Sequence, residues 1–229
     1  MRIAVLEDDL DQARLIEGWL TSAGHQCHHM SDGKGFLRTA IRESFDLLML
    51  DWLVPDMPGI EVLRRYRESE QGYTPVLFVT AKDREADIVE ALEAGADDYM
   101  SKPIREMELQ ARVAALGRRA HGGRRPEELP DIAPYKIDQA RDSIALNEEI
   151  VELTHREYEL AVFLFRNAGR VVSRDHILEA IWGMHGQQLN TRTVDTHVSR
   201  LRKKLCIGEE TGWKLTAIYQ HGYRLEKSG

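Results

Sequence analysis

Short hydrophobic runs alternate with amphipathic segments through the first half of the chain. Strand candidates occur at Ile3–Leu6, Gln26–Met30, Leu47–Leu50, Val76–Val79 and Asp98–Ser101. Between them, apolar side chains recur at helical spacing, as at Leu109, Val113 and Leu116. Five strands alternating with five helices predict a parallel α/β sheet covered by helices on both faces.

The second half of the chain has a different pattern. Three short alternating segments predict small antiparallel strands at Tyr135–Asp138, Ser143–Leu146 and Ile150–Leu153. Three amphipathic segments follow: one from a capping box at Thr154 to Gly169, one capped by Ser173, and one over Thr191–Leu205. The last two strand candidates, Trp213–Ile218 and Tyr223–Glu226, flank a turn. Three helices before a hairpin predict an α+β winged helix-turn-helix domain.

Residues 120–134 separate these two patterns. They contain three prolines, two glycines and five charged residues, which leaves little apolar surface to bury. We therefore expect a domain over 1–119, an extended linker over 120–134 and a second domain over 135–229.

The net charge of −7 is confined to the first half. Residues 1–120 hold 15 basic and 22 acidic side chains, whereas residues 121–229 hold 16 of each. Neither half is basic, so nucleic-acid binding would need a local patch. No apolar run approaches the roughly 20 residues of a membrane span, and the start of the chain does not resemble a signal peptide. Two distant cysteines favour a reducing, cytoplasmic setting.

Polar side chains follow the predicted strands of the first domain. Glu7 and Asp8 follow the first strand, Asp51 the third, Thr80 the fourth and Lys102 the fifth. The carboxyl ends of parallel strands meet at one edge, so these groups should converge. Carboxylates at such an edge suit Mg²⁺, and an aspartate can act as a nucleophile toward a phosphoryl group. Taken singly, each residue has an ordinary role as a turn residue, helix cap or surface charge.

Residues 1–119 resemble the receiver domain of two-component response regulators. The motifs are Glu7-Asp8, Leu50-Asp51, Pro55–Gly59, Thr80-Ala81 and Gly95–Pro103. The resemblance implies a five-stranded sheet of order 2-1-3-4-5, with phosphorylation by a sensor histidine kinase.

The same resemblance implies roles for single residues. Asp51 would be the phosphoacceptor, and Lys102 would pair with phosphoryl oxygens. Asp8, Asp51 and the carbonyl of Leu53 would bind Mg²⁺ directly, with Glu7 acting through water. Thr80 and Tyr99 would form the switch pair.

The resemblance also implies a homodimer on phosphorylation. The interface residues carried over are Asp97, Asp98, Glu108 and Arg112. Ile88 stands where the dimerising subfamily has a basic residue, so one ion pair would be missing. Ile104 replaces the usual Phe after the Lys-Pro pair.

The helix predicted over Thr191–Leu205 has two distinct faces. Val194, Val198, Leu201 and Leu205 share the inner face, opposite Arg192, Thr196, Ser199, Arg200 and Lys203. Between Thr191 and Lys204 there are five basic residues and one acid, Asp195. Such a helix fits the DNA major groove, although an ordinary solvated helix can have the same pattern.

Residues 135–226 resemble the effector domain of the OmpR/PhoB response-regulator family. The motifs are Leu153–Tyr158, Val171–Arg174, Arg192–Leu205 and Gly222–Arg224. The resemblance makes the third helix the recognition helix for double-stranded DNA. The DNA contacts it implies are Arg192, Thr193 and His197 on phosphates, Thr196 and Arg200 on bases, and Ser199, Arg202, Lys203 and Tyr223 as further candidates.

Two other features follow from this second resemblance. Residues 182–190, with Trp182, would form the loop that meets RNA polymerase. The family's wing arginine is absent, because this chain has Tyr219-Gln220-His221 at the hairpin turn, and Ser199 stands where an arginine is frequent.

We interpret the sequence as a DNA-binding response regulator rather than an enzyme. The alternative is an aspartyl-phosphate phosphatase. Dehalogenase-like phosphatases place both carboxylates after the first strand, whereas Asp51 stands alone after the third. A third hypothesis, a regulator that works without phosphorylation, is disfavoured by the complete acidic set.

Overall fold

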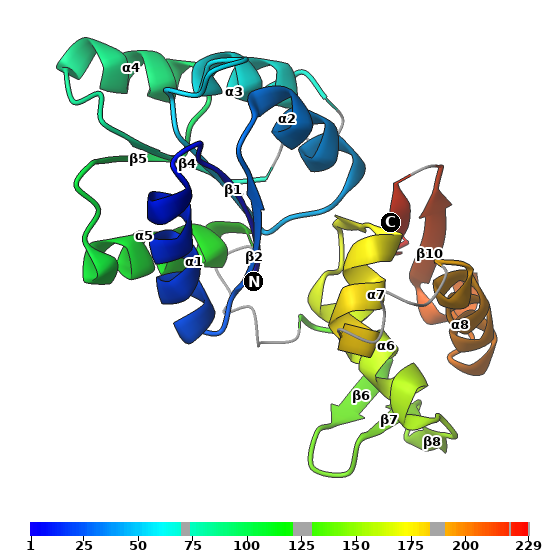
Figure 1. Ribbon diagram of the computed structural model, residues 1–229. Coiled ribbons are helices and arrows are strands. Elements are labelled where there is room, and N and C mark those ends of the chain that lie inside the picture. The colour runs from blue at the N-terminus through cyan, green and yellow to red at the C-terminus, as the bar shows by residue number, and fades with distance from the viewer. Residues whose placement is uncertain (70–73, 121–129, 184–190, 220, 229) are drawn as a thin grey trace. The chain divides into compact units, whose positions relative to one another are not determined.

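The computed structural model describes residues 1–69, 74–120, 130–183, 191–219 and 221–228. The chain forms two compact units, Met1–Pro126 and Glu127–Gly229, and Figure 1 labels most of their elements. Among the described residues, no helix has the length and hydrophobicity needed to cross a membrane.

The first unit is built on a five-stranded parallel sheet of order β2-β1-β3-β4-β5, the order that the resemblance implies. Its strands are β1 (Arg2–Leu6), β2 (Gln26–Met30), β3 (Leu47–Leu50), β4 (Val76–Thr80) and β5 (Asp98–Ser101). In the register of the central strands, Leu6 of β1 lies beside Leu50 of β3. The chain segments that follow β1 and β3 therefore leave the sheet side by side.

In the described part of this unit, five helices cover the two faces of the sheet. They are α1 (Leu10–Ser22), α2 (Gly33–Arg42), α3 (Gly59–Arg67), α4 (Glu85–Glu93) and α5 (Glu106–Ala120). Helices α1 and α5 lie on one face, and α2, α3 and α4 lie on the other (Figure 1).

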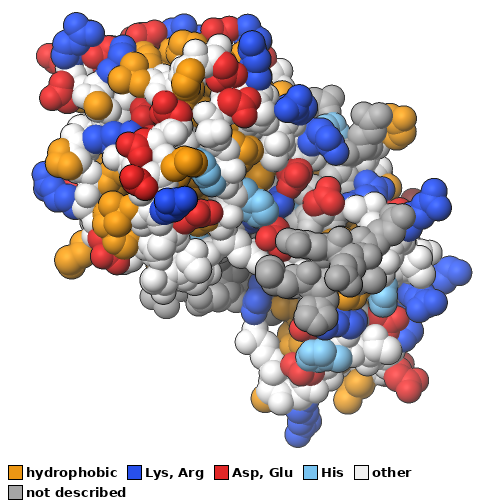
Figure 2. Space-filling view, viewed as in Figure 1, with side chains coloured by type: hydrophobic (Ala, Val, Ile, Leu, Met, Phe, Trp, Pro, Cys, Tyr) orange, Lys and Arg blue, Asp and Glu red, His pale blue; other side chains and the backbone are white. Residues whose placement is uncertain are grey.

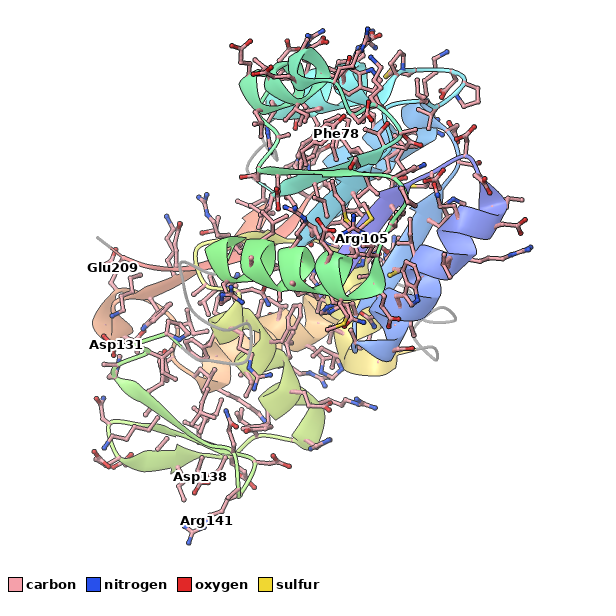
Figure 3. All side chains as sticks on the ribbon, turned by 90° about the vertical axis from the view of Figure 1, so that its left-hand side faces the viewer. Phe78, Arg105, Asp131, Asp138, Arg141 and Glu209 are labelled. Atoms are coloured by element: carbon pink, nitrogen blue, oxygen red, sulfur yellow. The ribbon has the colours of Figure 1, made fainter. Side chains whose placement is uncertain are left out.

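Side chains of each strand alternate between two cores. Ile3 and Val5 pack on the α1–α5 side, whereas Ala4 and Leu6 pack on the opposite side. Figure 3 shows Phe78 of β4 inside that second layer. All of β1, β3 and β4 is buried because both faces are covered, which explains their continuous apolar runs.

In its described residues, the second unit combines three α-helices with two small antiparallel sheets. Strands β6 (Tyr135–Asp138), β7 (Ser143–Leu146) and β8 (Glu149–Val151) form the first sheet, and Figure 3 shows Asp138 and Arg141 at the turn between β6 and β7. The helices are α6 (His155–Arg166), α7 (Arg174–Trp182) and α8 (Arg192–Lys204). A short helix, η2 (Glu209–Thr211), precedes a sheet of order β10-β11-β9, formed by β9 (Val171–Val172), β10 (Trp213–Ile218) and β11 (Gly222–Lys227).

Local sequence signals fix the helix starts in this unit. The capping box predicted at Thr154 and Glu157 is present, and the Ser173 side chain accepts a hydrogen bond from His176 N at 3.1 Å. Gly222 begins β11 with φ +144°, and a Cβ there would lie 1.9 Å from the carbonyl oxygen of Val172 in β9. Only glycine allows this close approach of two strands.

The structure differs from the sequence analysis at several boundaries. Helix α6 ends at Arg166 rather than near Gly169, β8 covers Glu149–Val151 rather than Ile150–Leu153, and the strand β9 was not predicted. Ala120, which we assigned to the linker, belongs to α5.

The end of the expected linker also packs against the second unit. Ile132 is buried in its core, Trp213 Nε1 donates to the carbonyl of Ala133 at 3.0 Å, and Lys227 pairs with Asp131 at 2.9 Å. One buried apolar side chain and two polar contacts are enough to hold this proline-rich segment against the second unit. The rest of the expected tether, 121–129, lies outside the described residues.

Candidate functional site

Three carboxylates meet at the carboxyl edge of the first sheet. Glu7 and Asp8 follow β1, and Asp51 follows β3. One oxygen from each lies within 4.8 Å of the others. Glu7 and Asp51 are 2% and 5% exposed, whereas Asp8 is exposed. The convergence predicted from the strand ends is therefore present.

Lys102 provides the positive charge that this cluster needs. Its Nζ lies 2.6 Å from Asp51 Oδ2 and 2.9 Å from Glu7 Oε2. Burial lowers the pKa of Lys102, but the hydrogen bonds to Asp51 and Glu7 outweigh it and the net shift is upward. Burial raises the pKa of Glu7 in spite of Lys102. The lysine therefore stays charged between the two carboxyl groups.

The loop after β3 fixes the orientation of Asp51. Leu53 N donates to Asp51 Oδ1 at 3.1 Å, and Gly59 N donates to the Trp52 carbonyl at 3.0 Å. A Cβ on Gly59 would lie 2.0 Å from the Asp51 carbonyl oxygen, so the turn requires glycine. Asp56 of this loop accepts hydrogen bonds from Gly33 N and from Lys34 N, which ties the loop to the start of α2.

The two expected switch residues lie on neighbouring strands. Thr80 is fully buried at the end of β4. Tyr99 of β5 stacks on Phe78 and donates its hydroxyl to the carbonyl of Lys82 at 2.7 Å. Burial raises the pKa of Tyr99 to about 12. The Tyr99 hydroxyl therefore contacts the segment that follows Thr80.

The loop after β4 is also attached to the residue beside Asp51. Lys82 Nζ lies 4.2 Å from the centroid of the Trp52 ring and 2.9 Å from Asp87 Oδ1. Lys82 thus links Trp52, the neighbour of Asp51, to Asp87 of α4.

The donor set at the sheet edge fits a hard divalent cation. Lys102 contacts two of the three carboxylates, and oxygen ligands are those that Mg²⁺ prefers. The carbonyl of Leu53 belongs to the same loop as Asp51.

The residues expected at a dimer interface make ion pairs within the chain. Arg112 Nη1 contacts both oxygens of Asp98 at 2.9 Å, and its Nη2 lies 2.8 Å from Glu108 Oε1. Asp97 pairs with Arg67 at 2.9 Å and also accepts from Val76 N. Asp98, Glu108 and Arg112 therefore form one surface network, whereas Asp97 also closes the loop between α4 and β5.

Helix α8 has the two faces that its periodicity predicts. Val194, Val198, Leu201 and Leu205 are at most 1% exposed. The opposite face exposes Arg192, Thr196, Ser199, Arg200 and Lys203. Within the described part of the chain, Arg200 and Lys203 form no ion pair. Figure 2 shows basic side chains on the edge of the second unit where α8 lies.

Three of the expected DNA contacts are engaged elsewhere. Tyr223 is only 6% exposed and donates its hydroxyl proton to Asp195 Oδ1 at 2.5 Å. A tyrosine hydroxyl carries one proton, so this bond prevents Tyr223 from donating to a phosphate. Arg202 donates to the carbonyl of Leu215 at 2.7 Å, and the His197 ring packs on Trp182 with centroids 5.1 Å apart. These side chains support α8, and the Tyr223 hydroxyl binds Asp195 in this structure.

The sequence analysis assigned no role to Arg174 or Asp195. Arg174 pairs with Asp195 at 2.8 Å, and its guanidinium lies over the Tyr223 ring. The sequence feature that could have indicated this ion pair is the single acidic residue in an otherwise basic helix.

Of the expected polymerase loop, 184–190 lies outside the described residues, as does Gln220 of the hairpin turn. Tyr219 beside it is 85% exposed.

Comparisons with known proteins agree on both units. Residues 3–114 match the response regulator receiver domain family, and residues 147–225 match the family described as transcriptional regulatory protein, C terminal. The chain is 38% identical over 206 residues to the response regulator protein PmrA of Pseudomonas aeruginosa, covering 90% of this chain and 91% of the relative.

Two further matches extend this likeness. The chain is 36% identical over 234 residues to the alkaline phosphatase synthesis transcriptional regulatory protein PhoP of Bacillus subtilis, covering 99% of this chain and 97% of the relative. Among solved structures, the receiver domain of the Francisella response regulator 1452 matches with a TM-score of 0.50 and 31% identity, over 52% of this chain and 97% of that chain.

Proposed function

The chain belongs to the OmpR/PhoB family of two-component response regulators, and from this premise we propose that phosphorylation of Asp51 controls DNA binding by the second unit. Its relatives are transcriptional regulators rather than enzymes. The observation that carries the proposal is the position of Lys102 between Glu7 and Asp51, at the edge where three carboxylates meet.

Asp51 would take the phosphoryl group from a phosphohistidine of a sensor kinase. A carboxylate oxygen forms a bond to phosphorus, the phosphorus–nitrogen bond breaks, and the electron pair leaves with the imidazole. Lys102 would turn from the Asp51 carboxylate to a phosphoryl oxygen, which restores its charge partner. The hydrogen bond from Leu53 N would keep the attacking carboxylate oriented.

Glu7, Asp8, Asp51 and the carbonyl of Leu53 would hold Mg²⁺, with Glu7 acting through a water molecule. When bound, the cation neutralises negative charge on phosphoryl oxygens. The Thr80 hydroxyl would donate to the phosphoryl group, and Tyr99 would follow it as the partner in the switch.

The change at Thr80 and Tyr99 would favour a homodimer through the surface of Asp98, Glu108 and Arg112, with Asp97 at its margin. The dimer would bring two second units onto directly repeated half-sites of double-stranded DNA in the cytoplasm.

On each half-site, α8 would enter the major groove, with Arg200 and Thr196 on bases and Arg192 and Thr193 on phosphates. Ser199 and Lys203 lie on the same exposed face, and the segment 182–190 would meet RNA polymerase.

Mass spectrometry of the full chain tests the phosphorylation site. After treatment with acetyl phosphate and Mg²⁺, we expect one phosphoryl group, located on Asp51 and absent from the Asp51→Asn variant. Asp83→Asn, at an exposed carboxylate after β4, is the matched control and should be phosphorylated like the wild type. A phosphoryl group retained by Asp51→Asn, or full labelling in a chelator, would contradict the proposal.

A further inference from the structure

Three side chains from three elements of the second unit meet beside α8. Asp195 lies in the first turn of α8, Arg174 begins α7, and Tyr223 lies at the start of β11. Arg174 Nε donates to Asp195 Oδ1 at 2.8 Å, and the Tyr223 hydroxyl donates to the same oxygen at 2.5 Å. The Arg174 guanidinium carbon lies 4.9 Å from the centroid of the Tyr223 ring. We call these three residues the Asp195 cluster.

The polar groups of the cluster are directed at one another. Burial favours the neutral form of Asp195, but the hydrogen bonds from Tyr223 and Arg174 prevail and lower the pKa of this carboxyl. Burial and the bond to Asp195 raise the pKa of the Tyr223 hydroxyl. At neutral pH the cluster is therefore an ion pair with a neutral phenol attached. Charge-assisted hydrogen bonds of this kind are stronger than neutral ones and fix direction.

The cluster holds one half of α8, and a separate contact holds the other. Asp195 reaches Tyr223, which is the neighbour of Gly222 at the hairpin turn. Seven residues later in α8, Arg202 reaches the carbonyl of Leu215 within β10. These two contacts align the helix with the hairpin, so that the hairpin turn lies beside the N-terminal half of α8. Because α8 is bound to the hairpin both at Asp195 and at Arg202, it cannot tilt against the hairpin without breaking one of these hydrogen bonds.

We propose that the Asp195 cluster is a positioning device for DNA recognition, which sets the angle between α7, α8 and the hairpin without itself touching DNA. The inference rests on the proposed function, in which α8 binds the major groove. A side chain that reads a base needs accurate placement, whereas attraction to phosphates tolerates displacement and is independent of sequence. Loss of the cluster should therefore weaken binding to a specific site and spare binding to other DNA.

The test measures the affinity of the full phosphorylated chain for two duplexes. One is a duplex that the wild-type protein enriches from a random pool, and the other is a scrambled duplex of the same composition. Tyr223→Phe keeps the ring and removes the hydroxyl, and should weaken binding to the enriched duplex about tenfold with no change on the scrambled duplex. Tyr158→Phe is the matched control, because Tyr158 of α6 is also 6% exposed. It should leave both affinities unchanged.

A double mutant adds a readout that a general loss of stability would not reproduce. If the hydroxyl acts through Asp195, then Tyr223→Phe should have little further effect on the ratio of the two affinities in the Asp195→Ala background. Circular dichroism verifies folding before each titration. If Tyr223→Phe does not fold, Arg174→Lys replaces it. That variant keeps the charge but loses the planar guanidinium over the ring, and should change the ratio in the same direction.

The outcomes separate the inference from its premise. Equal weakening on both duplexes would make Tyr223 a phosphate contact and overturn the positioning role. Unchanged affinities would overturn it as well, as would additive effects in the double mutant. If the wild-type chain enriches no duplex, the proposed function is wrong and the inference falls with it.

Discussion

Replacing Gly59 by alanine tests how tightly the turn after β3 holds Asp51. The added Cβ would lie 2.0 Å from the Asp51 carbonyl oxygen, whereas ordinary contact begins at 3.4 Å. The loop must therefore move by about 1.4 Å, a shift large enough to be felt in a close-packed interior. The obstructing atom belongs to the backbone, so it cannot turn aside as a flexible side chain would. We expect a loss of about 1–3 kcal/mol in the free energy of unfolding.

The same displacement should reach the phosphorylation site. Lys102 Nζ lies 2.6 Å from Asp51 Oδ2, and a shift of this size opens that contact. Misplacement of a reacting group by about 1 Å can slow a reaction by up to about a hundredfold, so we expect acetyl phosphate to label Gly59→Ala at least about tenfold more slowly.

Gly18→Ala is the matched control for this variant. Gly18 lies in the middle of α1, and a Cβ there would meet no atom within 4 Å. Alanine is the better helix former, so this variant should gain about 0.5–1 kcal/mol and be labelled like the wild type. Urea unfolding followed by circular dichroism and timed mass spectrometry measure both effects. Equal stability and equal labelling in the two variants would refute the reasoning about the turn.

Three other predictions concern single groups. Burial raises the pKa of Cys27 to about 12. A maleimide at pH 7.5, roughly one pH unit below the pKa of an ordinary thiol, should therefore label the exposed Cys206 first and Cys27 only after unfolding. Equal labelling rates at the two cysteines would contradict this. Burial alone would raise the pKa of Glu157, but its hydrogen bonds lower it below 4.5, so Glu157→Gln should cost about 1–3 kcal/mol at pH 7. A carboxyl group whose pKa is lowered by folding stabilises the fold at pH values above its unfolded pKa. The stability difference between Glu157→Gln and the wild type should therefore vanish as the pH falls through the folded-state pKa. A difference that urea titrations find independent of pH would contradict this explanation. Arg200→Ala should cost about 1–3 kcal/mol on the enriched duplex and much less on scrambled DNA, whereas Arg192→Ala should weaken both and lower the salt slope by about one; equal effects of Arg200→Ala on both would place it on phosphates.

The sequence predicts the first unit better than the second for a physical reason. Leu47–Leu50 is a strand in both the prediction and the structure, because a strand covered on both faces needs an unbroken apolar run. The site follows from this, since parallel strands bring their carboxyl ends to one edge. The position of Lys102 at this edge could be predicted because it follows the fifth strand. Its simultaneous contacts with Glu7 and Asp51 could not be predicted from the sequence.

Features of the second unit that depend on tertiary contacts escaped the sequence analysis. Strand β9 has two residues, too few for any periodicity, and exists because Gly222 lets β11 approach Val172. Tyr223 was assigned to DNA by resemblance, and only the position of Asp195 shows where its hydroxyl proton goes. Ile132 lies among prolines and charges, so composition gave no sign that it enters the core.

Residues of α8 that hold the helix in the domain are different from those that it exposes to solvent. Its inner face fills the core, Tyr135 donates its hydroxyl to the carbonyl of Leu205 at 2.7 Å, and Arg202 and Asp195 bind the hairpin. The exposed side chains at positions 196, 199, 200 and 203 take no part in these supports. Substitutions there change the surface offered to DNA at little expense in folding free energy. After a gene duplication, a copy of this chain could therefore acquire a new operator through a few changes at these positions while the domain continued to fold.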